Sequence, residues 1–413
     1  MNHPIELGRR DPEAASKSAF VQARADKYFT KSREIVERFG DKRVTYGVFM
    51  RRRVICAIDP ALELLREYYP ADGPIPLEIR RLYEEGAIVP DQKPLFTYSG
   101  SLAALLELET LVLQRVGFAC VTAYNAYKMA MNLPKTAFID MHARHATGDS
   151  MTRLAAYGAS VGSRMAKLNG AIGFVATSQD LTAGYYGQAG GVGTMPHAII
   201  GYAGSTLRAA QMFVEAHPAD NLTALVDYYG REYTDAIEVC RWWFDEYLPK
   251  NQNASSKSLA VRIDTHGDRF AEGLSYERSV EIVANWLHVF NEYEAVRSVM
   301  GEEAFDADTF NVTKDRVRRV LFGTGVSAAA IIHMRQRLDA RGYNACRIVG
   351  SSGFNLFKCK MFGNARVPLD VVGTGSFIPE ALGETYATAD IFMYDGEFDI
   401  KLGRERIFQA LKG

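Results

Sequence analysis

The amino-acid sequence predicts an α/β protein, in which an irregular parallel α/β barrel is joined to a smaller α+β domain. Three observations lead to this fold class. Short apolar runs alternate with amphipathic helical stretches after Pro134, most runs end on polar or glycine-rich residues, and the region before Pro134 mixes strand-like and helical patterns. Because parallel strands need crossover connections, this alternation favours a parallel sheet covered by helices.

The N-terminal part of the chain is expected to form the smaller domain. Residues 1–25 are predicted to form an N-terminal arm. Residues 43–58 are strand-like, and residues 101–131 carry apolar side chains at helical spacing. We expect the smaller α+β domain to comprise residues 26–135 together with C-terminal strands that return to it from residues 376–413.

The predicted barrel, residues 136–375, is built from eight strand-like runs. They are residues 136–141, 171–177, 190–198, 222–229, 259–268, 318–325, 346–353 and 369–376. Helical stretches lie between several of them, at residues 151–168, 205–216, 233–248 and 279–296. The third run is the weakest strand, so the barrel is expected to be irregular.

Polar and glycine-rich residues follow the runs at their C-terminal ends. These tails are Thr177 and Ser178, His197, Asp227, and residues 264–268, 323–325, 351–353 and 373–375. In α/β barrels the C-terminal ends of the strands build the active site. The agreement among these tails predicts an enzyme.

Composition excludes several other classes of protein. The formal net charge is −1 and charged residues make up 23% of the chain, so no basic footprint for nucleic acid is present. The N-terminal segment has no apolar core of a signal peptide, and no apolar run approaches the ~18 residues of a membrane span. The five cysteines are scattered without a C-x-x-C pair, as in a reduced cytoplasmic protein.

The last two tails indicate an anion site. Ser351, Ser352 and Gly353 follow one run, and Gly373, Thr374 and Gly375 follow the next. Small residues let backbone N–H groups approach an anion, and the loops after the seventh and eighth strands are the usual phosphate site of such barrels. The alternative is that these glycines only permit tight turns.

His197 stands directly after the glycine-rich stretch GGVGTMP, so it either fills a core position or is presented to a ligand. A metal-dependent barrel hydrolase is one alternative, because strand ends also carry Asp140, His142, His145, Asp264 and His266. That reading leaves both glycine loops without a role.

A family resemblance rests on several motifs in order. They are KPLFTYSGSLAALLELET at 93–110, ARHATGDS at 143–150, FVATSQDLTAG at 174–184, GTMPHA at 193–198, LVDYY at 225–229, VRIDTHGD at 261–268, SSGFN at 351–355, LDVVGTGS at 369–376 and TADIFMYDGEFDIKLGR at 388–404. Over roughly residues 26–405 the chain resembles the nicotinate phosphoribosyltransferases, which are type II phosphoribosyltransferases, and it looks most like the archaeal-type members.

The resemblance implies a reaction and its cofactors. Nicotinate and phosphoribosyl pyrophosphate would give nicotinate mononucleotide and pyrophosphate with Mg²⁺, coupled to ATP hydrolysis through a phosphohistidine, in a homodimer or higher homo-oligomer. His197 matches the family histidine, and Arg262 and Asp264 match its catalytic arginine and aspartate. No metal ligand is assigned to this chain, and neither nucleic acid nor a membrane is expected as a partner.

The resemblance also assigns substrate-binding residues. They are Tyr28, Arg144, His145, Thr177, Ser178 and Asp227. The chain departs from the family at three positions: His145 replaces a second arginine, Tyr228 replaces a threonine, and His266 is inserted before Gly267. Two further alternatives therefore stay open, a quinolinate or related pyridine phosphoribosyltransferase and a catalytically silent nucleotide-binding homologue.

Overall fold

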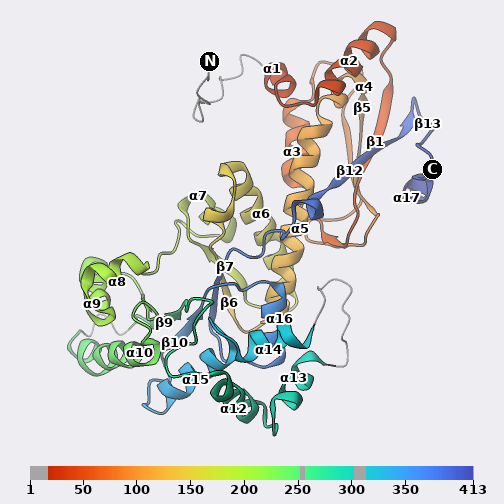
Figure 1. Cartoon of the computed structure of the whole chain (residues 1–413). Coiled ribbons are helices and arrows are strands. Elements are labelled where there is room, and N and C mark those ends of the chain that lie inside the picture. The colour runs from red at the N-terminus through yellow and green to blue at the C-terminus, as the bar shows by residue number, and fades with distance from the viewer. Residues whose placement is uncertain (1–16, 252–255, 302–312, 413) are drawn as a thin grey trace, which may run out of the picture. The chain divides into compact units, whose positions relative to one another are not determined.

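The computed structural model describes residues 17–251, 256–301 and 313–412, with its elements labelled in Figure 1. The chain divides into two compact units. The first comprises Met1–Tyr124 and Pro379–Gly413, and the second comprises Asn125–Ile378. Most of the predicted N-terminal arm, residues 1–16, lies outside the described residues, and α1 follows it at Lys17–Gln22.

The first unit is built on a five-stranded antiparallel sheet in the order β13-β12-β1-β5-β3. Its strands are β1 (Arg43–Met50), β3 (Glu78–Arg81), β5 (Pro94–Ser101), β12 (Ala387–Tyr394) and β13 (Glu397–Phe398). Because β12 pairs antiparallel with β1, the prediction of C-terminal strands that return to the N-terminal region is confirmed. A short ladder joins β2 (Val54–Ile55) and β4 (Ile88–Val89).

Helices and an aromatic cluster complete this unit. The helices are α2 (Lys27–Phe39), α3 (Asp59–Tyr68), α4 (Leu102–Leu106), α5 (Glu109–Asn132, which continues into the second unit) and α17 (Glu405–Phe408). Phe49, Phe392 and Phe408 form a buried cluster. A Cβ added at Gly47 would lie 2.1 Å from Cε1 of Phe408, so the C-terminal helix can pack on β1 only over a glycine.

The second unit contains a six-stranded, wholly parallel sheet in the order β7-β6-β11-β10-β9-β8. Its strands are β6 (Ala137–Asp140), β7 (Gly173–Thr177), β8 (Leu222–Leu225), β9 (Leu259–Ile263), β10 (Arg347–Gly350) and β11 (Val371–Thr374). The predicted α/β class with a parallel sheet is therefore confirmed. The last strand, β11, pairs with the first, β6, as the closing strands of a barrel would.

The prediction of eight strands is wrong at two runs. In the third, residues 190–196 form an irregular loop and His197 begins a helix. In the sixth, residues 318–322 belong to α14 (Lys314–Phe322), whose buried Val317 and Leu321 lie one helical turn apart. In the part of the chain that the structure describes, no ladder joins β7 to β8, so hydrogen bonding leaves the sheet open between them.

Helices cover the parallel sheet and connect its strands. They are α6 (Gly148–Leu168), α7 (Asp180–Ala183), α8 (His197–Ala203), α9 (Thr206–Ala216), α10 (Glu232–Arg241), a π-helical turn (Trp242–Tyr247), α11 (Leu248–Lys250), α12 (Tyr276–Leu287), α13 (Glu292–Met300), α14, α15 (Ala328–Asp339) and α16 (Leu356–Asn364). Side-chain N-caps start many of them, as Asn355 does for α16.

Two further observations concern the cysteines and the helices. All five cysteines are buried and free. None of the helices in the described ranges is long and apolar enough to cross a membrane.

Candidate functional site

The C-terminal ends of the parallel strands bring many of the predicted residues to one edge of the second unit. Asp140 ends β6 and Thr177 ends β7, while Asp227, Asp264 and Ser351 stand one or two residues beyond β8, β9 and β10. Because all six strands run in the same direction, these ends share one edge of the sheet, where α/β enzymes place their sites.

Arg262 lies at the centre of a polar cluster on this edge. Its Nη2 donates to Oδ2 of Asp264 at 3.0 Å, its Nε donates to Oγ of Ser351 at 3.1 Å, and its Nη1 donates to the hydroxyl of Thr194. Residues 262 and 264 point to the same face of the chain because side chains alternate along a strand. The Arg262 and Asp264 side chains are only 12% and 19% exposed, so their ion pair is largely shielded from water.

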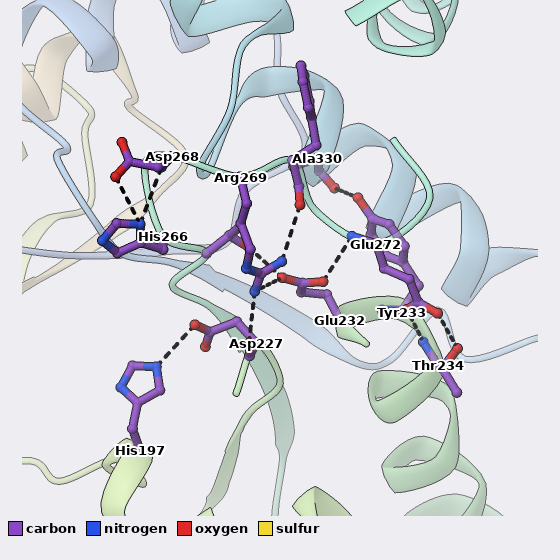
Figure 2. Close-up of polar contacts among 12 residues, drawn as sticks. His197, Asp227, Glu232, Tyr233, Thr234, His266, Asp268, Arg269, Glu272 and Ala330 are labelled. Carbon is purple, nitrogen blue, oxygen red and sulfur yellow. Dashed lines mark hydrogen bonds and ion pairs between the residues drawn. The ribbon is translucent and has the colours of Figure 1, made fainter. Parts of the chain in front are cut away.

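His197 and Asp227 form a second pair on this edge, drawn in Figure 2. The ring Nε2 lies 3.0 Å from Oδ2 of Asp227, and the His197 side chain is 46% exposed whereas Asp227 is only 7% exposed. Burial raises the pKa of Asp227, and the hydrogen bond from His197 opposes that shift. If Nε2 carries the proton that it shares with the carboxylate, Nδ1 keeps a free lone pair.

The glycine-rich loop before His197 is fitted closely to the end of β7. The amide of Val192 donates to the carbonyl oxygen of Thr177 at 2.7 Å. A Cβ at Gly191 would lie 2.8 Å from backbone atoms of Gln179, so this position requires glycine. The loop then runs past Arg262, which binds Thr194, and ends at the helix that carries His197. The sequence pattern therefore presents the imidazole at the site instead of burying it in a core.

A network around the buried Glu232 holds the backbone of Asp227, and sequence reasoning missed it. In Figure 2 the Arg269 guanidinium lies between the backbone of Asp227 and the carboxylate of Glu232. Its Nη2 is 2.8 Å from the carbonyl oxygen of Asp227 and 2.6 Å from Oε1 of Glu232. Glu232 also accepts bonds from the Thr265 hydroxyl and the Glu272 amide. These contacts join loops that are far apart in the sequence, and no local motif marks them.

The two predicted phosphate loops differ in what surrounds their glycines. Ser352 and Gly353 have φ values of 72° and 66°, and a Cβ at Gly353 would meet no atom within 4 Å. A Cβ at Gly375 would lie 2.8 Å from Cα of His142, and one at Gly373 would lie 2.7 Å from the Met141 side chain. Close packing against the loop after β6 thus accounts for Gly375, whereas Gly353 faces open space.

The two loops are joined to each other and to the neighbouring strand. The Thr374 hydroxyl donates to the carbonyl oxygen of Phe354 at 2.6 Å, and the amide of Ser351 donates to the carbonyl oxygen of Ile263 at 3.0 Å. The loops after β10 and β11 therefore form one connected surface beside the Arg262 cluster.

The remaining predicted residues occupy varied positions. Arg144 is exposed, and His145 beside it is exposed with a pKa lowered by partial burial and then by the charges of Arg144 and His142. Thr177 is buried and bonds the Thr182 hydroxyl at 2.9 Å, which gives it a local structural role. Ser178 is exposed. Tyr28, 61% exposed, belongs to α2 of the first unit.

Two histidines that the metal-dependent hydrolase alternative would use as ligands, His142 and His266, have other partners. Nδ1 of buried His142 lies 2.5 Å from Oδ1 of Asp140, and its Nε2 lies 3.1 Å from the carbonyl oxygen of Thr152. Both ring nitrogens therefore serve the fold. His266 is exposed and faces Asp268 at 3.7 Å. Across the described ranges no group of three His, Cys, Asp or Glu residues is placed to hold a metal ion, so these residues give the metal-dependent hydrolase alternative no set of three ligands.

Comparisons with known proteins place the fold. No protein-family model matches the sequence, and no curated protein matches it either. Among solved structures, nicotinate-nucleotide pyrophosphorylase from Pyrococcus furiosus is similar with a TM-score of 0.63 and 20% identity, covering 97% of this chain and 81% of that one.

Two other structures are similar over most of the chain. Human nicotinic acid phosphoribosyltransferase has a TM-score of 0.54 and 15% identity, covering 92% of this chain and 76% of the human one. NadC from Streptococcus pyogenes has a TM-score of 0.50 and 13% identity, covering 92% and 94%. Identities this low establish a shared fold, so the reaction has to be argued from the site.

Proposed function

We propose that the protein is a nicotinate phosphoribosyltransferase. One observation carries this proposal: the His197–Asp227 pair and the Arg262–Asp264–Ser351 cluster lie at the same edge of a parallel sheet, beside a glycine loop that opens onto free space. The fold that frames this edge is shared with structures whose names describe nicotinate-nucleotide pyrophosphorylase and nicotinic acid phosphoribosyltransferase.

The proposed reaction exchanges one bond at the anomeric carbon. The pyridine nitrogen of nicotinate forms a bond to C1 of phosphoribosyl pyrophosphate, and the bond from C1 to the pyrophosphate oxygen breaks. Positive charge develops on the ribose while negative charge grows on the leaving group. We assign Asp264 to the ribose hydroxyls and the developing cation, and Arg262 to the departing anion. The hydrogen bond from Arg262 to Asp264 orients the Asp264 carboxylate.

The carboxylates at this edge fit a magnesium ion. The Oδ1 atom of Asp227 is buried without a hydrogen-bond partner, and Asp264 acts on the same carboxylate electrostatically. Mg²⁺ prefers oxygen donors and is commonly held by one or two carboxylates together with substrate phosphates. Asp227 and Asp264 would hold it, and the ion would neutralise charge on the leaving pyrophosphate. Asp227 and Asp264 are also proposed to orient the substrate.

His197 is assigned as the phosphoryl acceptor that couples the reaction to ATP hydrolysis. Its Nε2 faces Asp227, so Nδ1 is the nitrogen left for nucleophilic attack, and the carboxylate stabilises the positive ring that attack creates. In that step the bond from Nδ1 to the γ-phosphorus forms as the bond to the ADP oxygen breaks. The exposed ring of His197 supports this role, because an ATP phosphate can reach it.

The pyridine site is assigned to residues at and beyond the ends of β6 and β7, of which Thr177 is buried and the others are exposed. Arg144 and His145 are proposed to bind the nicotinate carboxylate, while Ser178 and the bonded hydroxyl of Thr177 lie at the next strand end. Tyr28 is proposed to stack on the pyridine ring in a homodimer. A stripe of exposed apolar side chains along α2 (Tyr28, Ile35 and Phe39) supports association through this helix.

The test is product identification with a panel of acceptors. The purified chain is incubated with phosphoribosyl pyrophosphate and Mg²⁺, with nicotinate, nicotinamide or quinolinate, and with or without ATP. We expect nicotinate mononucleotide and pyrophosphate, with ATP lowering the amount of substrate needed. Product only from quinolinate would favour the quinolinate alternative, and no nucleotide from any pyridine would refute the proposal.

A further inference from the structure

Lys358 is bonded to the loop after β10. It stands on the first turn of α16, and its Nζ donates a hydrogen bond to the carbonyl oxygen of Ser352 at 2.9 Å. The ammonium also lies over the Phe354 ring, 4.2 Å from its centroid, and Asp264 acts on it electrostatically. None of the sequence motifs includes this lysine, so its contacts are seen only in the fold.

The hydrogen bond from Lys358 fixes the direction of one peptide unit. In a trans peptide the carbonyl oxygen and the following N–H point in opposite directions. With its carbonyl turned to Lys358, the Ser352–Gly353 peptide directs the Gly353 amide away from the lysine. Ser352 adopts φ of 72°, which is uncommon for a residue with a side chain, so this turn needs such support. The space around Gly353 is free of other atoms within 4 Å of a Cβ position.

We propose that Lys358 is a positioning residue for phosphate binding, which holds the Ser352–Gly353 peptide so that the Gly353 amide faces the phosphate and which offsets part of the anion's charge from behind the loop. The inference rests on the proposed function, since it concerns the phosphate site of the same reaction. The ligand chemistry is a phosphate monoester dianion, such as the 5′-phosphate of a phosphoribosyl group.

The protonation of Lys358 gives this role a pH signature. Burial lowers the pKa of Lys358 to about 8, and the groups that oppose this shift are Cys359 on the same helix and Asp264 beyond β9. Burial raises the pKa of the Cys359 thiol far above this range. Phosphate monoesters are dianions above about pH 7, because their second pKa lies near 6. A bound dianion favours the ammonium form, so phosphate affinity should fall as pH rises through about 8.

The experiment measures binding of two phosphate monoesters, ribose 5-phosphate and glucose 6-phosphate, by calorimetry at pH 7 and pH 9, because both are mainly dianions over this range. For the full-length wild type we expect affinity to fall by up to about tenfold between these pH values. For Lys358→Met we expect about tenfold weaker binding at pH 7 with little further change at pH 9. Lys358→Arg should restore most of the affinity and bind equally at both pH values. Lys360→Met, on another face of α16, is the control and should behave as the wild type.

The outcomes separate this inference from the proposed function. If the wild type binds neither anion, the phosphate site and the inference both fail. If it binds them and Lys358→Met keeps wild-type affinity and pH dependence, Lys358 has only a structural role and the inference alone is overturned. Thermal unfolding of each variant verifies that it is folded, and Lys358→Gln replaces the methionine variant if that one does not fold.

Discussion

Glu232 offers a sharp test of how the loops behind the site are held. Its carboxylate is fully buried and accepts bonds from the Arg269 guanidinium at 2.6 Å, the Thr265 hydroxyl at 2.9 Å and the Glu272 amide at 2.9 Å. Glu232→Gln keeps the shape of the side chain and replaces one acceptor oxygen with an NH₂ group. In either orientation of the amide, its NH₂ group faces a donor, either Arg269 or the Glu272 amide. In the wild type the carboxylate accepts from both of these donors.

The expected cost follows from these contacts. A buried donor left without its acceptor costs about 1–3 kcal/mol. The charge of Arg269 adds less, because its side chain is 36% exposed and regains water. We therefore expect Glu232→Gln to lower the free energy of unfolding by about 2 kcal/mol, which corresponds to a fall in Tm of roughly 4–8 °C for a unit of this size.

The assay is urea unfolding and thermal unfolding followed by circular dichroism, with phosphoribosyl transfer measured in parallel. Glu281→Gln is the matched control, since Glu281 pairs with Arg278 and both side chains are about half exposed. It should change the free energy of unfolding by less than about 0.5 kcal/mol. Because Arg269 also holds the carbonyl oxygen of Asp227, Glu232→Gln should reduce transfer as well. A loss no larger than that of the control would refute the reasoning.

Three further predictions concern single positions. Burial, together with Asp390 and Asp26, raises the pKa of Glu109 to about 7. The folded state therefore holds a proton that the unfolded chain loses, and the free energy of unfolding should decline as pH rises from about 4.5 to 7. Glu109→Gln should flatten this decline, and an unchanged pH profile of Tm in this variant would contradict the assignment. Gly375→Val should lower Tm more than Gly353→Val, since its Cβ would strike the backbone at His142, whereas at Gly353 only the positive φ of 66° opposes a side chain. Gly353→Val should also weaken ribose 5-phosphate binding; unchanged binding in this variant would contradict the assignment of Gly353 to the phosphate. His197→Ala should abolish acid-labile labelling by γ-labelled ATP while a slower ATP-independent transfer survives; label retained in this variant would place the phosphoryl group elsewhere.

The sequence predicted the parallel sheet because alternating apolar runs and helices leave few other arrangements. It failed at residues 318–325, where a short apolar run fits a strand or a helix equally well. The decisive features lay outside that run: Thr313 caps α14, and Val317 extends its apolar face by one turn. The third run failed for a different reason, since glycines that fit against Gln179 were read as part of a strand.

The sequence predicted those site residues that lie within local motifs. Arg262 and Asp264 were predictable as a pair because positions two apart on a strand share a face. The roles of Glu232, Arg269 and Lys358 were not, because each depends on loops that meet only when the strands are placed side by side. Likewise, glycine content alone did not distinguish Gly375, which packs against its own chain, from Gly353, which faces open space.

The missing ladder between β7 and β8 has a mechanical consequence for His197. The segment that spans this gap is not a strand, so its displacement would break no ladder of the sheet. Hydrogen bonds from Val192 to the end of β7 and from Arg262 to Thr194 hold its glycine-rich loop, and the buried Met195 and Ile200 anchor the start of α8. A shift of the loop that carries His197 would therefore leave the paired strands in place, together with Asp264 beyond β9 and the loop after β10.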